Sequence, residues 1–164
     1  MKNEKTVGFT CGSFDLMHAG HVLMFEECKK SCDYLIVGVQ SDPSIDRPDE
    51  KNRPIQEFAE RILLVNSVRW VDEVVPYHTE EDLYVLLKEI NPDVRIVGDD
   101  WRGRKYTGHD LDIDVVFNSR SHTYSTSELR LRVYEAEKSK VEDHAEKMSK
   151  QNYSGTGKYP TGSD

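Results

Sequence analysis

Short apolar runs of strand length alternate along this chain with longer stretches in which apolar residues recur at helical spacing. The runs are rich in Val and Ile, which is typical of parallel strands covered on both faces. They predict strands at residues 6–10, 34–39, 71–75, 94–98 and 113–117, with Pro76 ending the third strand.

Helical patterns fill the intervals between these strands. Residues 57–68 place Phe58, Ile62 and Val65 near one face. The acidic residues 80–82 open a helix that runs to residue 90, and further helices are predicted at 22–30 and 127–148. Strands that alternate with helices predict a parallel sheet with right-handed crossovers, and therefore an α/β fold.

A polar turn at residues 12–21 joins the first strand to the first helix. A strand, a tight turn and a helix start direct backbone N–H groups and the positive end of the helix dipole toward an anion. His18 and His21, three residues apart, lie on one face and can reach the same phosphate. Gly20 between them lets a bulky ligand approach the backbone. The turn therefore predicts a nucleoside triphosphate site.

Two other interpretations of these histidines remain open. A histidine near a helix start is often a cap or a surface residue. His, Cys and Asp are all zinc ligands, but the second Cys/His pair of a zinc site does not follow, and we predict no metal site. The G-x-G-x-x-G fingerprint is absent after the first strand, which argues against a redox enzyme that binds a dinucleotide.

Three polar segments each follow a predicted strand. Residues 13–21 follow the first, residues 99–104 the fourth and residues 120–127 the fifth. Ligands of parallel sheets bind at the carboxyl ends of the strands, near the point where the strand order reverses. We therefore expect these segments to converge at one edge of the sheet and form a single site.

Bulk properties narrow the class of protein. The length of 164 residues suits one domain with a single core. A formal net charge of −8 argues against nucleic-acid binding. The three cysteines predict no disulfide framework and fit a reducing cytoplasm. No apolar run approaches the roughly 18 residues of a membrane span, so we expect a cytoplasmic protein that binds no membrane.

The end of the chain differs from the rest in composition. Residues 1–136 are predicted to form the folded domain. Residues 137–164 are predicted to be a charged helical extension followed by a disordered tail, beginning near residue 151, that is rich in Gly, Ser, Thr and Lys.

Four segments together resemble one known family. Residues 12–21 match the G-x-F-D-x-x-H-x-G-H signature of the cytidylyltransferase-like nucleotidyltransferases. Residues 69–76 (RWVDEVVP) and 98–101 (GDDW) resemble glycerol-3-phosphate cytidylyltransferases, and residues 120–127 (RSHTYSTS) resemble the family's R-T-x-G-I-S-T-T segment. The resemblance implies a Rossmann-like, doubly wound, parallel five-stranded sheet of the HIGH-superfamily nucleotidyltransferase type.

The same resemblance implies a reaction. CMP would pass from CTP to sn-glycerol 3-phosphate, giving CDP-glycerol and pyrophosphate, with Mg2+ carried on the triphosphate and with a homodimer as the working unit. Such transfer needs positioning and charge stabilisation more than covalent chemistry. No Ser-His-Asp or Cys-His arrangement has recognisable spacing, so we expect direct in-line attack.

Other activities stay open. Asn52-Arg53-Pro54 resembles nucleotidyltransferases that use ATP, such as those that activate heptose phosphates. The nearest alternative is therefore an adenylyltransferase or cytidylyltransferase that acts on another phosphorylated sugar, alcohol or cofactor precursor. A nucleotide sensor without turnover and a tail that binds a partner are further alternatives.

The resemblance also implies residue roles. His18, His21 and Arg120 would hold the charge of the transition state, and Lys51 would touch both substrates. Asp100 would bind cytosine, and Arg69 the acceptor's phosphate unless it forms a surface ion pair. Trp101 would cover the ligand or anchor its loop, and hydroxyls 125–127 would bind phosphates or only cap their helix. The predicted substrate-binding residues are Ser13, Phe14, Asp15, Ala19, Gly20, Arg69, Asp100, Trp101, Ser121, Tyr124, Ser125, Thr126 and Ser127.

Two segments depart from the family pattern. His122-Thr123-Tyr124 stands where the family has a glycine and an aliphatic residue, which changes the expected nucleotide pocket. The lysine loop is rearranged over residues 46–54. The sequence therefore predicts the type of reaction more firmly than the base or the acceptor.

Overall fold

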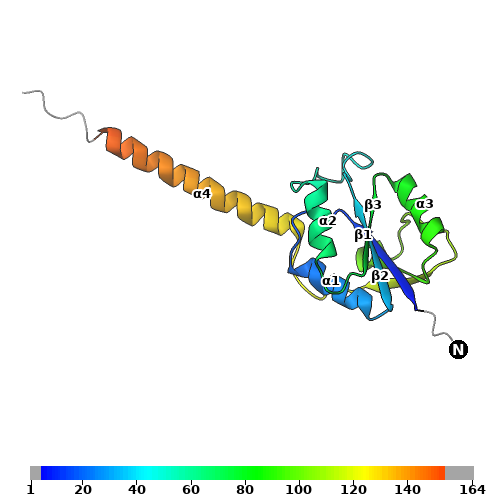
Figure 1. Ribbon diagram of the computed structural model, residues 1–164. Helices are drawn as coiled ribbons and strands as arrows, with labels where there is room; N and C mark the ends of the chain where they lie inside the picture. The colour runs from blue at the N-terminus through cyan, green and yellow to red at the C-terminus, as the bar shows by residue number, and fades with distance from the viewer. Residues whose placement is uncertain (1–4, 154–164) are drawn as a thin grey trace, which may run out of the picture. The chain divides into compact units, whose positions relative to one another are not determined.

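The computed structural model describes residues 5–153, with side chains through residue 148. The chain divides into two compact units between Thr126 and Ser127. The elements, in chain order, are β1 (Val7–Gly12), α1 (Ala19–Lys29), β2 (Tyr34–Gln40), α2 (Phe58–Asn66), β3 (Glu73–Tyr77), α3 (Glu80–Ile90), β4 (Val94–Gly98), the short 3-10 helix η1 (Asp99–Trp101), β5 (Asp114–Asn118) and α4 (Thr126–Tyr153) (Figure 1).

All five strands are parallel and form one sheet in the order β3-β2-β1-β4-β5. The chain winds outward from β1 to β3 and then returns to add β4 and β5 on the other side of β1. The strand order therefore reverses between β1 and β4, which is where open α/β sheets bind ligands. This topology confirms the predicted Rossmann-like, doubly wound α/β fold.

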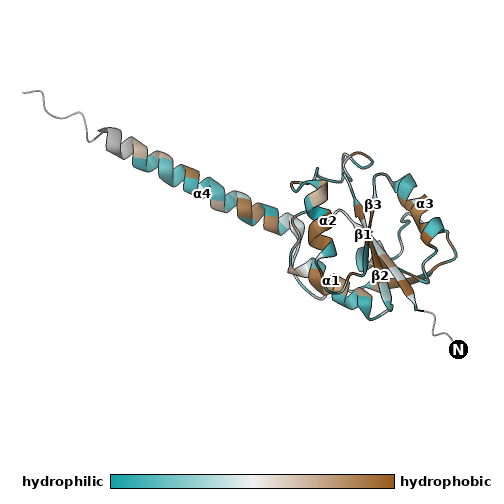
Figure 2. Ribbon diagram, viewed as in Figure 1, coloured by the Kyte–Doolittle hydropathy of each residue, from teal (hydrophilic) through white to brown (hydrophobic). Residues whose placement is uncertain are grey.

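Helices cover both faces of the sheet (Figure 1). On one face, Phe25 of α1 and Val65 of α2 pack with Val37 of β2 in the larger hydrophobic cluster. On the other face, Leu83 and Leu87 of α3 pack against β1 and β2 in a second cluster. Apolar residues make up much of the central strands (Figure 2), and the two clusters cover both faces of β1 and β2, which explains the apolar runs in the sequence.

The sequence prediction for the third strand was wrong at its end. Pro76 lies inside β3 and pairs with Val39 of β2, where it was expected to stop the strand. β3 is an edge strand with a single neighbour, so a proline that lacks an N–H group costs no ladder hydrogen bond on its open side.

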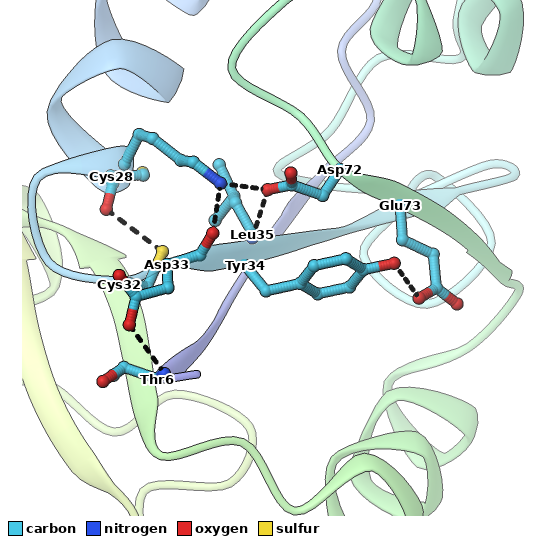
Figure 3. Close-up of polar contacts among 9 residues, drawn as sticks. Thr6, Cys28, Cys32, Asp33, Tyr34, Leu35, Asp72 and Glu73 are labelled. Atoms are coloured by element: carbon cyan, nitrogen blue, oxygen red, sulfur yellow. Dashed lines mark hydrogen bonds and ion pairs between the residues drawn. The ribbon is translucent and has the colours of Figure 1, made fainter. Parts of the chain in front are cut away.

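The amino-terminal edge of the sheet is closed by a polar network (Figure 3). Asp72, just before β3, forms an ion pair with Lys29 at the end of α1 and accepts a hydrogen bond from the Leu35 amide at 2.7 Å. The Lys29 ammonium also donates to the Asp33 carbonyl at 2.6 Å, and the Asp33 carboxylate accepts from the Thr6 amide at 3.0 Å. This network links the C-terminal end of α1 to the beginnings of β1, β2 and β3. The carboxyl-terminal ends of these strands, at the opposite edge of the sheet, take no part in it.

The second unit consists of α4 after Thr126. Its apolar side chains are largely exposed, including Leu131, Tyr134 and Val141. The helix continues to Tyr153, so residues 151–153 are helical where the sequence predicted the start of a disordered tail. The rest of that predicted tail, residues 154–164, lies outside the described residues. Within the described part of the chain, no helix is long and apolar enough to cross a membrane.

Candidate active site

The loop between β1 and α1 is held by buried side chains. Phe14 has a φ of 50°, in the left-handed region, and is 4% exposed. Its ring lies 5.1 Å from that of Phe25. The Asp15 carboxylate, also buried, accepts hydrogen bonds at 2.9 Å from the Ile55 and Gln56 amides. Because both side chains are turned into the protein, these two predicted substrate-binding residues build the loop, and any contact with substrate would come from their backbone.

Arg61 of α2 holds the same loop through hydrogen bonds to backbone carbonyls. Arg61 is 1% exposed, and its guanidinium donates to the carbonyls of Ser13 at 2.6 Å and Gln40 at 2.7 Å, as well as to that of Ser41. Its Nε donates to the Gln56 carbonyl at 3.2 Å. Burial lowers the pKa of Arg61, although the nearby carboxylates of Asp15 and Asp42 oppose that shift.

Sequence reasoning missed Arg61, although a signal was present. Arg61 lies three residues after Phe58 and four before Val65, on the apolar face of the predicted helix. A charged residue in the middle of an apolar stripe is unusual unless its hydrogen-bonding groups find partners.

The two histidines of the turn cap the start of α1. The Gly20 amide donates to Nδ1 of His18 at 3.1 Å, and the His18 amide donates to Nδ1 of His21 at 3.3 Å. Each Nδ1 is therefore an acceptor, so the proton of each neutral ring is on Nε2. The cap thus fixes the tautomer and presents two Nε2–H donors from rings whose centroids are 4.1 Å apart.

Both imidazoles are held in the neutral form. Burial lowers the pKa of His21 to about 3, and the charges of His18, Arg120 and His122 add to the shift, against a smaller opposing effect of Asp15. The pKa of His18 is also lowered, by burial and by His122. Near neutral pH both rings are uncharged hydrogen-bond donors.

The loop that follows β5 meets the start of α1. Nε2 of His18 lies 3.3 Å from the Thr126 hydroxyl. A Cβ on Gly20 would lie 2.6 Å from Cε1 of His122 and 2.9 Å from Cε1 of His18, so only glycine leaves room for both rings. Two of the three segments predicted to converge therefore do so, around Gly20.

The segment that follows β4 contacts the loop that follows β5 through Asp100 and Arg120. The Arg120 guanidinium lies 3.4 Å from the Asp100 carboxylate and contributes to the lowered pKa of His21. Its terminal nitrogen is also 3.8 Å from where a Cβ on Gly98 would stand. Arg120 thus connects η1 with the histidines, and all three predicted segments meet at the carboxyl edge of the sheet.

Other predicted site residues surround this cluster or lie apart from it. The Tyr124 ring is 5.5 Å from that of His122, and Trp101 is partly buried at the end of η1. Ser13 is partly buried in the turn, whereas Ala19, Ser121 and Ser125 are exposed. Ser127 belongs to the second unit.

Two predicted residues are not brought to the histidines by contacts that the structure describes. Arg69 precedes β3 at the amino-terminal edge, the opposite edge of the sheet, with its guanidinium 5.7 Å from the Trp70 ring. Lys51 is exposed on the loop between β2 and α2, where its amide donates to the Arg47 carbonyl at 2.9 Å.

In the part of the chain that the structure describes, no group of three or more His, Cys, Asp or Glu side chains is placed to hold a metal ion.

The doubly wound sheet, the strand reversal and the paired histidines at its carboxyl edge define a fold and site of the nucleotidyltransferase type. The family model described as cytidylyltransferase-like matches residues 9–132, and the chain belongs to this family. It is accordingly an enzyme of the nucleotidyltransferase family.

Curated relatives share part of their length with this chain. The bifunctional protein HldE of a Nitratiruptor species is 39% identical over 114 residues, which are 70% of this chain and 24% of that protein. HldE of Campylobacter curvus is 34% identical over 137 residues, which are 84% of this chain and 29% of that protein. The chain thus spans less than a third of the length of these relatives.

Solved structures share the fold. The lipopolysaccharide core biosynthesis protein of Thermoplasma volcanium superimposes with a TM-score of 0.59 at 25% identity, covering 74% of this chain and 100% of that one. Pantothenate synthetase of Thermus thermophilus, at 16% identity, gives a TM-score of 0.51 over 70% of this chain and 55% of that one. The latter similarity concerns the fold alone.

Proposed function

We propose that this chain transfers a nucleoside monophosphate from a nucleoside triphosphate to the phosphate of a small acceptor, with CTP and sn-glycerol 3-phosphate as the first pair to test. The observation that carries the proposal is the 3.3 Å contact between Nε2 of His18 and the Thr126 hydroxyl. It brings the capped histidines together with the Thr126 hydroxyl, so that hydrogen-bonding groups from two separate loops face one place, as a polyphosphate requires.

The reaction is a direct in-line displacement. An oxygen of the acceptor's phosphate forms a bond to the α-phosphorus, the bond from that phosphorus to the bridging oxygen breaks, and pyrophosphate leaves with the electron pair. The attacking oxygen is already anionic, so no general base is needed. The Nε2–H groups of His18 and His21 are suited to stabilise charge on the reacting phosphates, because the tautomer fixed by the cap leaves both groups as donors.

The proposed contacts select the base of the nucleotide less strictly than they bind its phosphates. We propose that Asp100 accepts a hydrogen bond from the exocyclic amino group of the base. Cytosine and adenine both present such an amino donor, so a carboxylate by itself does not separate CTP from ATP. Arg120 holds the Asp100 carboxylate in place at 3.4 Å.

A second candidate is adenylyl transfer from ATP to a phosphorylated sugar. It is favoured by the segment Asn52-Arg53-Pro54 and by relatives named HldE at 34–41% identity. A structural match described as a lipopolysaccharide core biosynthesis protein points in the same direction. We propose that Lys51, on the same loop, contacts the acceptor. Arg69 lies at the opposite edge of the sheet and is left out of this site.

The decisive experiment is a pyrophosphate-release assay with Mg2+ across four nucleoside triphosphates and a panel of phosphorylated alcohols and sugars. Release with CTP and glycerol 3-phosphate alone would support the first candidate. Release with ATP and a sugar phosphate would reject it in favour of the second. No release with any pair, from a folded protein that binds no triphosphate, would contradict nucleotidyl transfer altogether.

The proposed working unit is a homodimer in the cytoplasm. The three free cysteines, Cys11, Cys28 and Cys32, suit a reducing compartment. Light scattering of the full chain at assay concentrations would test the dimer, and a monomer mass under conditions of full turnover would reject it.

A further inference from the structure

A third imidazole stands at the candidate site, at a position to which the family pattern gives no function. His122 belongs to the loop between β5 and α4, four residues before Thr126. Its Cε1 would lie 2.6 Å from a Cβ on Gly20, and its charge influences both His18 and His21. Three histidine rings therefore surround one glycine at the start of α1.

The hydrogen bonding of the three rings differs. His18 and His21 each use Nδ1 to accept a backbone N–H group. Nδ1 of His122 is inaccessible to solvent, yet it has no hydrogen-bond partner among the described residues. A buried polar atom without a partner costs about 1–3 kcal/mol, so such atoms are rare and call for an explanation.

The charges around His122 favour an anionic partner. On its own loop lies Arg120, and from α1 it faces His18 and His21. The nearby carboxylates already have contacts, because Asp15 binds two backbone amides and Asp100 lies beside Arg120. A polyanion that entered here would meet one guanidinium and three imidazoles.

We infer that His122 binds the pyrophosphate portion of the triphosphate through Nδ1, as a third histidine contact beside His18 and His21, after a turn of the imidazole ring that opens this buried atom to the ligand. The inference rests on the proposed function. The segment that carries His122 leads directly to Thr126, one of the hydroxyl residues expected to bind phosphates. His122 would donate a hydrogen bond to a phosphate oxygen in the bound nucleotide and to the departing pyrophosphate.

A purely structural role is the competing explanation. The ring covers Gly20 and lies 5.5 Å from the Tyr124 ring, so it could serve only to fill space between the loop and α1. Removal of a space-filling ring would weaken the binding of all ligands together or lower the melting temperature. Removal of a phosphate contact would affect pyrophosphate selectively.

Three substitutions in the full-length chain separate these roles. In His122→Asn the side-chain amide nitrogen occupies the place of Nδ1, in His122→Gln it extends to the place of Nε2, and His122→Ala removes both. Binding of inorganic pyrophosphate, CMP and AMP is measured by calorimetry and by inhibition of pyrophosphate release. His109→Ala is the matched control, because His109 is exposed and bonds only its own loop through the Tyr106 carbonyl at 2.9 Å.

We expect His122→Ala to weaken pyrophosphate binding by roughly ten- to a hundred-fold, as for a hydrogen bond to a charged group. Binding of the nucleoside monophosphates and the melting temperature should stay close to wild type. His122→Asn should recover most of the pyrophosphate affinity, and His122→Gln should not.

Equal losses for pyrophosphate and monophosphates, or no loss at all, would overturn the inference, as would equal behaviour of the Asn and Gln variants. These outcomes differ from failure of the proposed function. In that case the wild-type chain itself would bind neither pyrophosphate nor any triphosphate.

Discussion

At the scale of single residues, His18 combines a structural and a proposed chemical role on different atoms. Nδ1 caps α1 by accepting from the Gly20 amide, while Nε2 faces the Thr126 hydroxyl. Asparagine is a favourable N-cap and can accept the same backbone hydrogen bond, but it has no counterpart of Nε2. We therefore predict that His18→Asn keeps the melting temperature and lowers kcat by about 100- to 1000-fold.

Steady-state kinetics of pyrophosphate release, together with a thermal melt, would check this prediction. His18→Ala serves as the comparison, because it removes the cap as well and should lower the melting temperature. Full turnover by His18→Asn would show that Nε2 has no part in the reaction.

Arg61 and Arg95 are both buried, but substitution by methionine is expected to change the free energy of unfolding differently at the two positions. Arg61 donates to four backbone carbonyls, whereas Arg95 is 5% exposed and its Nε and Nη1 have no partner among the described residues. Arg61→Met should therefore cost at least about 3 kcal/mol in the free energy of unfolding, because the carbonyls lose their donors. Arg95→Met should be neutral within about 1 kcal/mol or stabilising.

Urea unfolding of both variants tests the comparison. The Arg95 guanidinium does contact the Cys11 thiol at 3.2 Å and lies 4.9 Å from the centre of the Phe9 ring. If Arg95→Met proved as destabilising as Arg61→Met, these contacts would outweigh the cost of burying an unpaired charge.

At the scale of an element, the start of α1 should make stability depend on pH. The pKa of His21 is about 3 in the folded chain, against 6.5 as its ordinary value. Between these values the unfolded chain binds a proton that the folded chain does not. Stability therefore falls as the pH is lowered from 6.5 toward 3, by about 1.4 kcal/mol per pH unit from this residue, and His18 acts in the same direction.

The free energy of unfolding, measured in urea from pH 4 to pH 8, should fall less steeply toward acid in His21→Asn than in wild type. Asparagine keeps an acceptor for the His18 amide but cannot take up a proton. An identical slope in the two proteins would mean that His21 is not held neutral by the fold.

We predict that position 20 requires glycine because neighbouring side chains leave no room for a Cβ, and not because of its backbone conformation. Alanine at this helical position is favoured by about 1 kcal/mol in propensity. Its Cβ, however, would lie 2.6 Å from the His122 ring and 2.9 Å from the His18 ring. Gly20→Ala should therefore leave the melting temperature nearly unchanged and greatly reduce pyrophosphate release. Wild-type turnover by this variant would mean that the three rings need not be packed together.

The elements themselves could be predicted from the sequence, because each strand contains a short apolar run and α3 carries acidic residues in its first turn. The error at Pro76 arose because the run does not reveal which strand lies at the edge of the sheet. Convergence of the three loops followed from parallel topology alone. Arg61 carried a signal as a charged residue in an apolar stripe, but its partners and those of His122 could not be assigned, because these contacts span 48 and more than 100 residues of sequence.

At the scale of the whole molecule, the fold and the site belong to the first unit. The side chains that form the two hydrophobic clusters come from residues 7–111, and the family match ends at residue 132. α4 continues for about six turns beyond that residue, and its side chains from residue 133 to residue 148 are exposed. Few buried contacts would therefore be lost if the later part of α4 were removed.

We predict that a chain ending at Ala136 folds with a melting temperature close to that of the full chain and retains its kcat and KM. A matched truncation after Asn118 removes the loop with Arg120, His122 and Thr126, and should abolish pyrophosphate release. Light scattering of both proteins would show whether the removed helix sets the oligomeric state. Loss of turnover in the chain ending at Ala136, with the sheet still folded, would mean that the exposed part of α4 contributes to the reaction.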